Sequence, residues 1–297
     1  MNAAHLPRPA LYGLVALGVL AASFGAILVR FAGDTPPLAV AAWRLSLTSI
    51  TLLPIALVRG RILRLRRREI LLSVASGVAL AAHFVLWIAS LRDTSVASSV
   101  LFVTTHPIFV ALGARLVLKE RGSSGLAIGI ALALLGGVLI ASGDVQTGGT
   151  ALRGDFLALG GGFAVSVYFL IGRVVRRRVG VIDYVTLTYG VAAIVVCSMA
   201  GATGTPLIGF EPRVYIFLVL LAVGPQLIGH TTFNWALKHL PASRVSVFIL
   251  GEPIGSTLLA LAFFGEVPTW LTGLGAAIIL CGIALSLRTK EEPDGQP

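Results

Sequence analysis

HPIFVALGARLVLKE (residues 106–120) and EPIGSTLLALAFFGE (residues 252–266) lie 146 positions apart and share one pattern. Each begins with an ionisable residue and a proline, continues through mostly apolar residues and ends at a glutamate. Both stretches are apolar enough to lie in lipid, where a charge and a helix-breaking proline each carry an energetic cost. A costly pattern that occurs twice at one spacing indicates an internal repeat in a membrane protein.

The repeat extends well beyond these two stretches. A shift of 146 residues aligns residues 90–120 with residues 236–266 without a gap. Near the start of each half, residues 27–31 resemble residues 170–174 at a shift of 143. The matched positions include Leu91 with Leu237, Phe84 with His230, Pro107 with Pro253, Glu120 with Glu266, Gly129 with Gly275 and Gly136 with Gly282. Prolines, glutamates and glycines in one register predict two homologous halves rather than a shared composition.

The composition indicates a membrane protein. Of the 297 residues, 56% are hydrophobic and only 12% are charged, with a mean hydropathy of +0.93, whereas a soluble domain carries about 25% charged residues. The net charge of +10 does not indicate a nucleic-acid partner, because six arginines fall in residues 59–68 and four in 173–178, between apolar runs. That is the placement of basic residues that set orientation in membrane loops.

The apolar runs predict an all-α integral membrane fold. A helix needs about 20 mostly apolar residues to cross the hydrocarbon core, and lipid-facing backbone must satisfy its own hydrogen bonds. Ten segments meet this requirement. We place the ten transmembrane helices at residues 10–31, 37–58, 69–91, 94–118, 124–143, 154–173, 182–203, 214–238, 241–264 and 268–287.

The charge distribution predicts the orientation. With an even number of spans, sixteen Lys and Arg fall on the side that holds both termini and three fall on the opposite side. This bias predicts cytoplasmic N and C termini in a multi-pass protein of the cell inner (plasma) membrane. Five helices per half is an odd number, so the second half enters the membrane inverted. The predicted units are a first repeat at 10–143, a second at 154–287 and a cytoplasmic tail at 288–297.

These features resemble the EamA type of the drug/metabolite transporter superfamily. Residues 106–143 and 252–286 carry the resemblance: in both, a proline precedes about a dozen mostly apolar residues, a glutamate and a last helix punctuated by glycine. Residues 154–178 also resemble the start of the family's second repeat. The resemblance implies ten helices in two inverted repeats, a central cavity and the movement of small metabolites, often amino-acid export.

Glu252 and His106 occupy equivalent positions in the two halves, and both are candidates for substrate binding and proton coupling. An intramembrane carboxylate is a functional candidate by default, and an imidazole exchanges protons near physiological pH. The alternative is that both side chains bond to backbone groups that the kinks release, or that Glu252 pairs with a nearby Arg. Pro107 and Pro253 would bend their helices and act as hinges.

Further polar and aromatic residues are candidates for substrate contact. His83 and Trp87 are one turn apart and share a helix face, and His230 and Asn234 repeat that spacing in the second half. The remaining candidates for substrate binding are Ser99, Thr105 and Tyr168. The alternative for this set is helix–helix packing, with polar groups bonding across the bundle. Arg44, deep in its span, would either meet a substrate carboxylate or pair with a carboxylate or helix end for structure.

The function predicted from these features is secondary transport, with alternating access through a cavity between the halves and export of small metabolites such as amino acids. The partners are a small-molecule substrate, the bilayer and protons as a candidate coupling ion, with the chain a monomer or weak homodimer. Neither GxxxxGK[ST], HExxH nor GxSxG occurs, so we expect no enzyme activity, cofactor or metal. A membrane-embedded lipid-modifying enzyme, a passive channel and a non-transporting receptor remain the alternatives.

Overall fold

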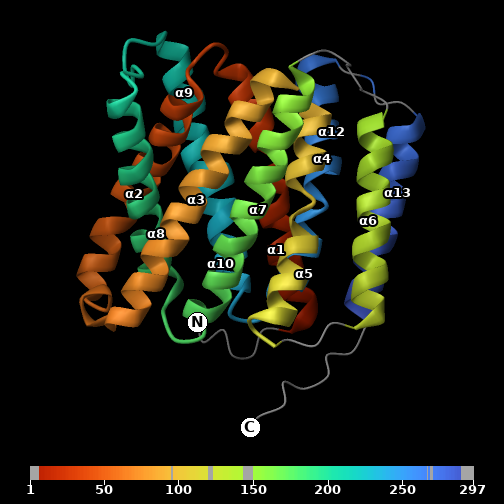
Figure 1. Cartoon of the computed structure of the whole chain (residues 1–297), viewed down its shortest axis with the longest axis horizontal. Coiled ribbons are helices and arrows are strands. Elements are labelled where there is room, and N and C mark those ends of the chain that lie inside the picture. Colours follow the sequence, from red (N-terminus) through yellow and green to blue (C-terminus); the bar gives the residue numbers. More distant parts are fainter. Residues whose placement is uncertain are drawn as a thin grey trace.

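A computed structural model describes residues 7–94, 96–119, 123–142, 150–265, 267 and 270–288, and within them the secondary structure is helical, without strands. The first half contains α1 (Arg8–Phe31), α2 (Pro37–Arg59), η2 (Ile62–Arg64), α3 (Arg67–Asp93), α4 (Val96–Val103), α5 (His106–Leu116) and α6 (Ser124–Ser142). The second half contains α7 (Ala151–Arg176), α8 (Val181–Ala202), α9 (Pro212–Leu221), η3 (Ala222–His230), α10 (Thr231–Ala236), α11 (Ala242–Ile249), α12 (Glu252–Phe264) and α13 (Trp270–Arg288). Figure 1 shows these helices side by side in one bundle.

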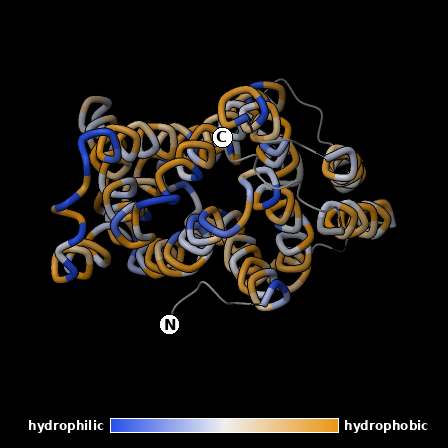
Figure 2. The backbone as a smooth tube through the Cα atoms, turned by 90° about the horizontal axis from the view of Figure 1, so that it is seen from below, coloured by the Kyte–Doolittle hydropathy of each residue, from blue (hydrophilic) through white to orange (hydrophobic). Residues whose placement is uncertain are grey.

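The all-helical membrane fold predicted from the sequence is confirmed. Among the described residues, eight helical stretches are long and apolar enough to cross a membrane, and two shorter apolar helices occupy Ser124–Leu139 and Gly273–Ser286. Large apolar side chains point outward from the bundle, among them Leu17 and Ile194, which are 60% and 68% exposed. Viewed along the helices, most of the backbone carries hydrophobic residues (Figure 2). Such a surface is suited to lipid rather than water.

Two spans are broken at the positions of the repeated prolines. The predicted helix at 94–118 consists of α4 and α5, separated at Thr104 and Thr105, and the helix at 241–264 consists of α11 and α12, separated at Leu250 and Gly251. Pro107 and Pro253 stand in the first turn of the second piece, where the missing N–H needs no partner. The sequence predicted kinks, whereas the helices break immediately before the His-Pro and Glu-Pro pairs. Hinge motion at these points stays a prediction.

A third irregularity interrupts the span Pro212–Ala236 and was not predicted. Its central section, η3, is a π-helix that contains Pro225. Proline supplies no N–H and displaces the carbonyl four residues earlier, so the wider turn accommodates it. Such π segments widen a helix locally and are frequent at functional sites. Here the π-helix ends at His230, a predicted site residue.

The two halves interlock through their first helices. α1 packs against η3 and α12 of the second half, while α7 packs against α3, α4 and α5 of the first half. Glycines bring these helices close: a Cβ on Gly161 of α7 would lie 3.3 Å from the Trp87 backbone nitrogen, and one on Gly229 of η3 would lie 3.2 Å from the Ala22 nitrogen. Small residues at helix crossings are the usual means of close packing in membranes.

α6 and α13 form a pair at one edge of the bundle (Figure 1). A Cβ on Gly129 would lie 2.7 Å from the Gly282 carbonyl oxygen, and Gly136 faces the Gly275 carbonyl. Contact positions rise along one helix as they fall along the other, so the pair is antiparallel. In the repeat alignment Gly129 is equivalent to Gly275 and Gly136 to Gly282, and this reciprocal exchange of partners is what a two-fold relation produces.

Candidate functional site

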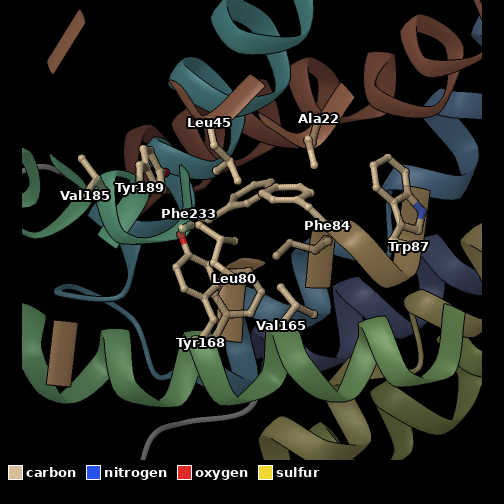
Figure 3. Packing of buried hydrophobic residues seen from close by; sticks show 14 of the residues in the cluster. Ala22, Leu45, Leu80, Phe84, Trp87, Val165, Tyr168, Val185, Tyr189 and Phe233 are labelled. Atoms are coloured by element: carbon tan, nitrogen blue, oxygen red, sulfur yellow. The ribbon is translucent and has the colours of Figure 1, made fainter. Parts of the chain in front are cut away.

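A small, partly open cavity of about 40 Å³ lies where the two halves meet. A buried water needs roughly 10–15 Å³ of such space, so the cavity has room for only a few waters. Its wall combines five ionisable side chains with aromatic and aliphatic ones. The lining residues are Ala22, Arg44, His83, Phe84, Trp87, Val103, Thr104, His106, Val165, Phe169, His230, Phe233, Ile249 and Glu252. Figure 3 shows Ala22, Phe84, Val165 and Phe233 converging from different helices.

Most of this wall is built from repeat-equivalent positions. The shift of 143 relates Ala22 to Val165, and the shift of 146 relates four further pairs across the cavity. Those pairs are Phe84 with His230, Trp87 with Phe233, Val103 with Ile249, and His106 with Glu252. The rings of Phe84 and His230 meet edge to face with centroids 5.2 Å apart. The cavity therefore lies where equivalent positions of the two halves face each other. Four lining residues have no repeat-equivalent residue in the wall: Arg44, His83, Thr104 and Phe169.

His83 is held in place by the helix that faces it. Its Nδ1 lies 2.9 Å from the carbonyl oxygen of Gly161 in α7. Its ring is parallel to that of Trp87, one turn further along α3, with centroids 6.2 Å apart. The His230 ring lies 6.1 Å from that of His83. The contact of Nδ1 with the Gly161 carbonyl fixes the orientation of the His83 ring and leaves its Nε2 edge for other partners.

His106 and Glu252 begin the second pieces of the two broken spans and face the same cavity. His106 Nδ1 lies 3.2 Å from the Val103 carbonyl oxygen at the end of α4, which is the kink contact that the sequence offered as an alternative. His106 Nε2 is buried without a hydrogen bond. The Glu252 carboxylate makes no hydrogen bond or ion pair within the part of the chain that the structure describes. Both side chains therefore keep hydrogen-bonding capacity for a ligand.

Arg44 is the most buried cation of the site, at 1% exposure. Its Nε donates to Gln226 Oε1 over 2.7 Å, and its guanidinium carbon lies 4.0 Å from the centroid of the Phe84 ring. Among the described residues no carboxylate lies within ion-pair distance of Arg44, so pairing with an acid, one alternative from the sequence, does not occur there. An amide and an aromatic face hold it instead.

Four polar atoms of the cavity wall are buried without a hydrogen-bond partner among the described residues. They are Arg44 Nη1, Trp87 Nε1, His106 Nε2 and His230 Nδ1. More than nine tenths of buried polar groups in proteins are paired, because an unpaired one costs about 1–3 kcal/mol. Four such atoms around one cavity are the arrangement expected of a site that receives a polar ligand.

Four predicted substrate residues lie outside the cavity wall. The Ser99 hydroxyl is 2.6 Å from that of Ser90, and the Thr105 hydroxyl donates to the Phe102 carbonyl oxygen over 2.7 Å. Asn234 Nδ2 donates to the Tyr168 hydroxyl. All four side chains thus make contacts within the bundle, and their contact with substrate stays a prediction. The wall does contain His83, Trp87, His106, His230 and Glu252.

Several wall residues were not chosen from the sequence. Phe169, Phe233, Val165 and Ala22 are ordinary residues of apolar helices, and no local pattern separates them from packing residues. Applying the shifts of 143 and 146 to the chosen positions would have found Phe233 from Trp87. The approach of Gln226 to Arg44 depends on η3, whose π geometry has no sequence pattern beyond Pro225.

A bundle of lipid-facing helices whose two repeated halves enclose a polar cavity defines a multi-pass membrane protein of the transporter class. The model of the EamA-like transporter family matches this chain twice, at residues 10–142 and 152–288. The chain therefore belongs to the EamA-like transporter family, and the resemblance noted in the sequence is confirmed.

Individual relatives agree with this assignment. The chain is 25% identical to the uncharacterized transporter YdfC of Bacillus subtilis (strain 168) over 272 residues, covering 91% of this chain and 88% of that one. It is 24% identical to human solute carrier family 35 member G1 over 276 residues, covering 88% and 73%. A protein of known crystal structure shares the fold with a TM-score of 0.79 at 20% identity, over 94% of this chain and 97% of the other.

Proposed function

We propose that this protein is a secondary active transporter that exports small metabolites, amino acids or related amphipathic compounds, by alternating access through the central cavity. The observation that carries the proposal is the group of four unpartnered polar atoms around one small cavity between the two halves. A space for a few waters is too small for an amino acid, so a substrate requires the halves to separate on one side at a time. Aromatic walls with few polar groups suit an amphipathic ligand.

The proposed topology has ten membrane-spanning helices, cytoplasmic N and C termini and an inner (plasma) membrane location. Arginines of both rich segments lie together at one end of the bundle, since Arg61, Arg64 and Arg66 share a surface pocket with Arg178. Basic residues gathered at one end are favoured on the cytoplasmic side. The proposed assembly is a monomer or weak homodimer, with no nucleic-acid partner.

The proposed coupling residues are Glu252 and His106, and the proposed hinges are Pro107 and Pro253. Both ionisable groups face the cavity and stand at helix breaks, where two short helices can reorient without bending a continuous one. A proton on Glu252 would neutralise the one carboxylate among the described residues of the cavity wall. Removing that negative charge would change the affinity for a substrate cation, which links proton and substrate movement.

Reconstitution into liposomes tests the proposal. Purified protein is incorporated into vesicles loaded with a panel of labelled amino acids and amines, and efflux is measured with and without a pH gradient. We expect saturable efflux of a subset of compounds that protein-free vesicles do not show. A channel would instead give non-saturable flux of many solutes, and absence of flux for every compound would contradict the transporter assignment.

A further inference from the structure

We infer that Arg44, together with the indole of Trp87, forms a carboxylate-binding subsite in the central cavity, and that Glu252 receives the substrate's ammonium group, so that the protein selects small zwitterions. This inference rests on the proposed transport function and specifies which compounds that function moves.

The first step is the unused capacity of Arg44. A guanidinium offers five N–H donors, and the one hydrogen bond that Arg44 makes to a described residue uses only Nε. Nη1 is buried without a partner, and Arg44 lines the cavity. Gln226 Oε1 and the Phe84 face fix the plane of the guanidinium, which leaves its outer nitrogens for a planar acceptor. A carboxylate is the group that this geometry binds most strongly.

The second step is the close packing beside Arg44. Gly25 of α1 faces both side chains: a Cβ there would lie 3.3 Å from Trp87 Cη2 and 4.0 Å from Arg44 Nη1. Any larger residue at position 25 would therefore contact the indole and approach the guanidinium. Trp87 Nε1, a donor only, is likewise buried without a partner. Arg44 and Trp87 therefore contribute two unsatisfied donors to the wall of one cavity, which a ligand with two acceptor oxygens can satisfy.

The third step is the charge balance. Arg44 and Glu252 both line the cavity but are not within ion-pair distance of each other. A ligand that carries one negative and one positive group would neutralise both, and the complex would have no uncompensated charge. A phosphate dianion would leave negative charge beside Glu252, and a simple amine would leave the guanidinium unpaired. A zwitterion is thus the class that the two charges select.

The fourth step is asymmetry. His106 and Glu252 are repeat-equivalent, whereas the position 146 residues after Arg44 is Gly190 and the position 143 after it is Leu187. The cation therefore has no counterpart in the other half. A carboxylate subsite on one side of a two-fold cavity would orient the substrate in one direction, which the symmetric part of the wall does not do.

The test compares three compounds in the liposome assay: the amino acid that the wild-type protein moves fastest, its decarboxylated amine and its deaminated acid. We expect the wild type to move the amino acid with a kcat/KM at least tenfold above either analogue. Arg44→Gln should lower kcat/KM for the amino acid roughly 10- to 100-fold, the loss typical of a hydrogen bond to a charged group, and leave the amine unchanged.

Gln226→Glu provides a near-isosteric second variant that keeps Arg44. The new carboxylate would occupy the guanidinium, so amino-acid transport should fall about tenfold or more while folded yield is preserved. This variant decides the matter if Arg44→Gln does not fold. Arg213→Gln removes an exposed arginine, 74% exposed, and should transport like wild type.

Equal transport of the amine or the deaminated acid by the wild type would overturn the subsite while leaving the transporter assignment intact. An equal loss of transport for all three compounds in well-folded Gln226→Glu would also overturn the subsite. Absence of wild-type flux for the whole panel would overturn the proposed function and this inference with it.

Discussion

The bond between Asn234 and Tyr168 gives a prediction that separates packing from substrate contact. Both side chains are fully buried. Asn234 Nδ2 donates to the Tyr168 hydroxyl, lies 2.7 Å from the His230 carbonyl oxygen and lies 3.4 Å from the Tyr189 hydroxyl. This amide therefore ties α10 to α7 and α8.

Tyr168→Phe removes one hydroxyl, with its hydrogen bonds to Asn234 and Tyr189, without opening a large cavity. Such bonds in membrane proteins contribute about 0.6 kcal/mol on average and up to about 1.7 kcal/mol, so we expect a loss of unfolding free energy in that range. Asn234→Ala removes three contacts and should cost about 1–3 kcal/mol. In the Asn234→Ala background the hydroxyl has lost its amide donor and keeps only Tyr189, so Tyr168→Phe should then cost less than it does in the wild type.

The assay is a double-mutant cycle, with unfolding followed by circular dichroism in mixed detergent micelles as the denaturing detergent is increased. We expect a coupling energy of at least about 0.6 kcal/mol. Additivity of the two substitutions within about 0.3 kcal/mol would refute the reasoning. The same variants in liposomes separate the two roles of Tyr168: a packing role lowers stability at constant KM, whereas substrate contact raises KM.

Three further predictions follow from the contacts described above. Glu252→Gln should abolish flux driven by a pH gradient while folded yield remains, and surviving proton-driven flux would exclude Glu252 as the coupling group. Gly129→Ala should destabilise the α6–α13 pair by about 1–3 kcal/mol through overpacking, since its Cβ would lie 2.7 Å from a carbonyl oxygen. Gly273→Ala is the control: its Cβ would meet nothing within 4 Å, so the substitution should be neutral or stabilising in the same unfolding assay. Burial, with Lys238 and Arg176 nearby, lowers the pKa of His239. Because the unfolded chain then binds the proton more readily, the unfolding free energy should decrease as pH falls below about 6.5. The decrease should be less steep in His239→Gln, and identical slopes in the two proteins would count against this cause.

The fold was accessible from the sequence because lipid imposes strict rules on helix length and backbone pairing. The runs at 106–120 and 252–266 identified the repeat, and the family assignment followed from it. The breaks before His106 and Glu252 were anticipated only as kinks, because proline marks where a helix is disturbed without specifying how the preceding turn closes. The π-helix at η3 was missed, because Pro225 marks a disturbed helix without specifying that the turn widens.

The sequence predicted those site residues whose types are rare in apolar helices, and it did not separate site residues from packing residues where the type is common. His83, His106, His230 and Glu252 are unusual in apolar helices, and all four line the cavity. Ser99 and Thr105 were chosen only as neutral hydrogen-bonding groups, and Asn234 for its one-turn spacing from His230; their hydroxyl and amide groups are taken up within the bundle. The partners of Arg44 lie 40 and 182 positions away along the chain, so its surroundings became clear only in three dimensions.

The most direct test of alternating access through this cavity is the accessibility of a single cysteine at Val165, 4% exposed and in the wall, in a Cys197→Ser, Cys281→Ser background. Val196→Cys, buried in α8 away from the wall, is the matched control. A membrane-impermeant thiol reagent is applied to one side of the vesicles at a time, with and without the transported compound. We predict that Val165→Cys is labelled from one side, that substrate shifts the labelling between sides, and that the control stays unlabelled. Equal labelling from both sides at once, or no labelling under any condition, would contradict the account.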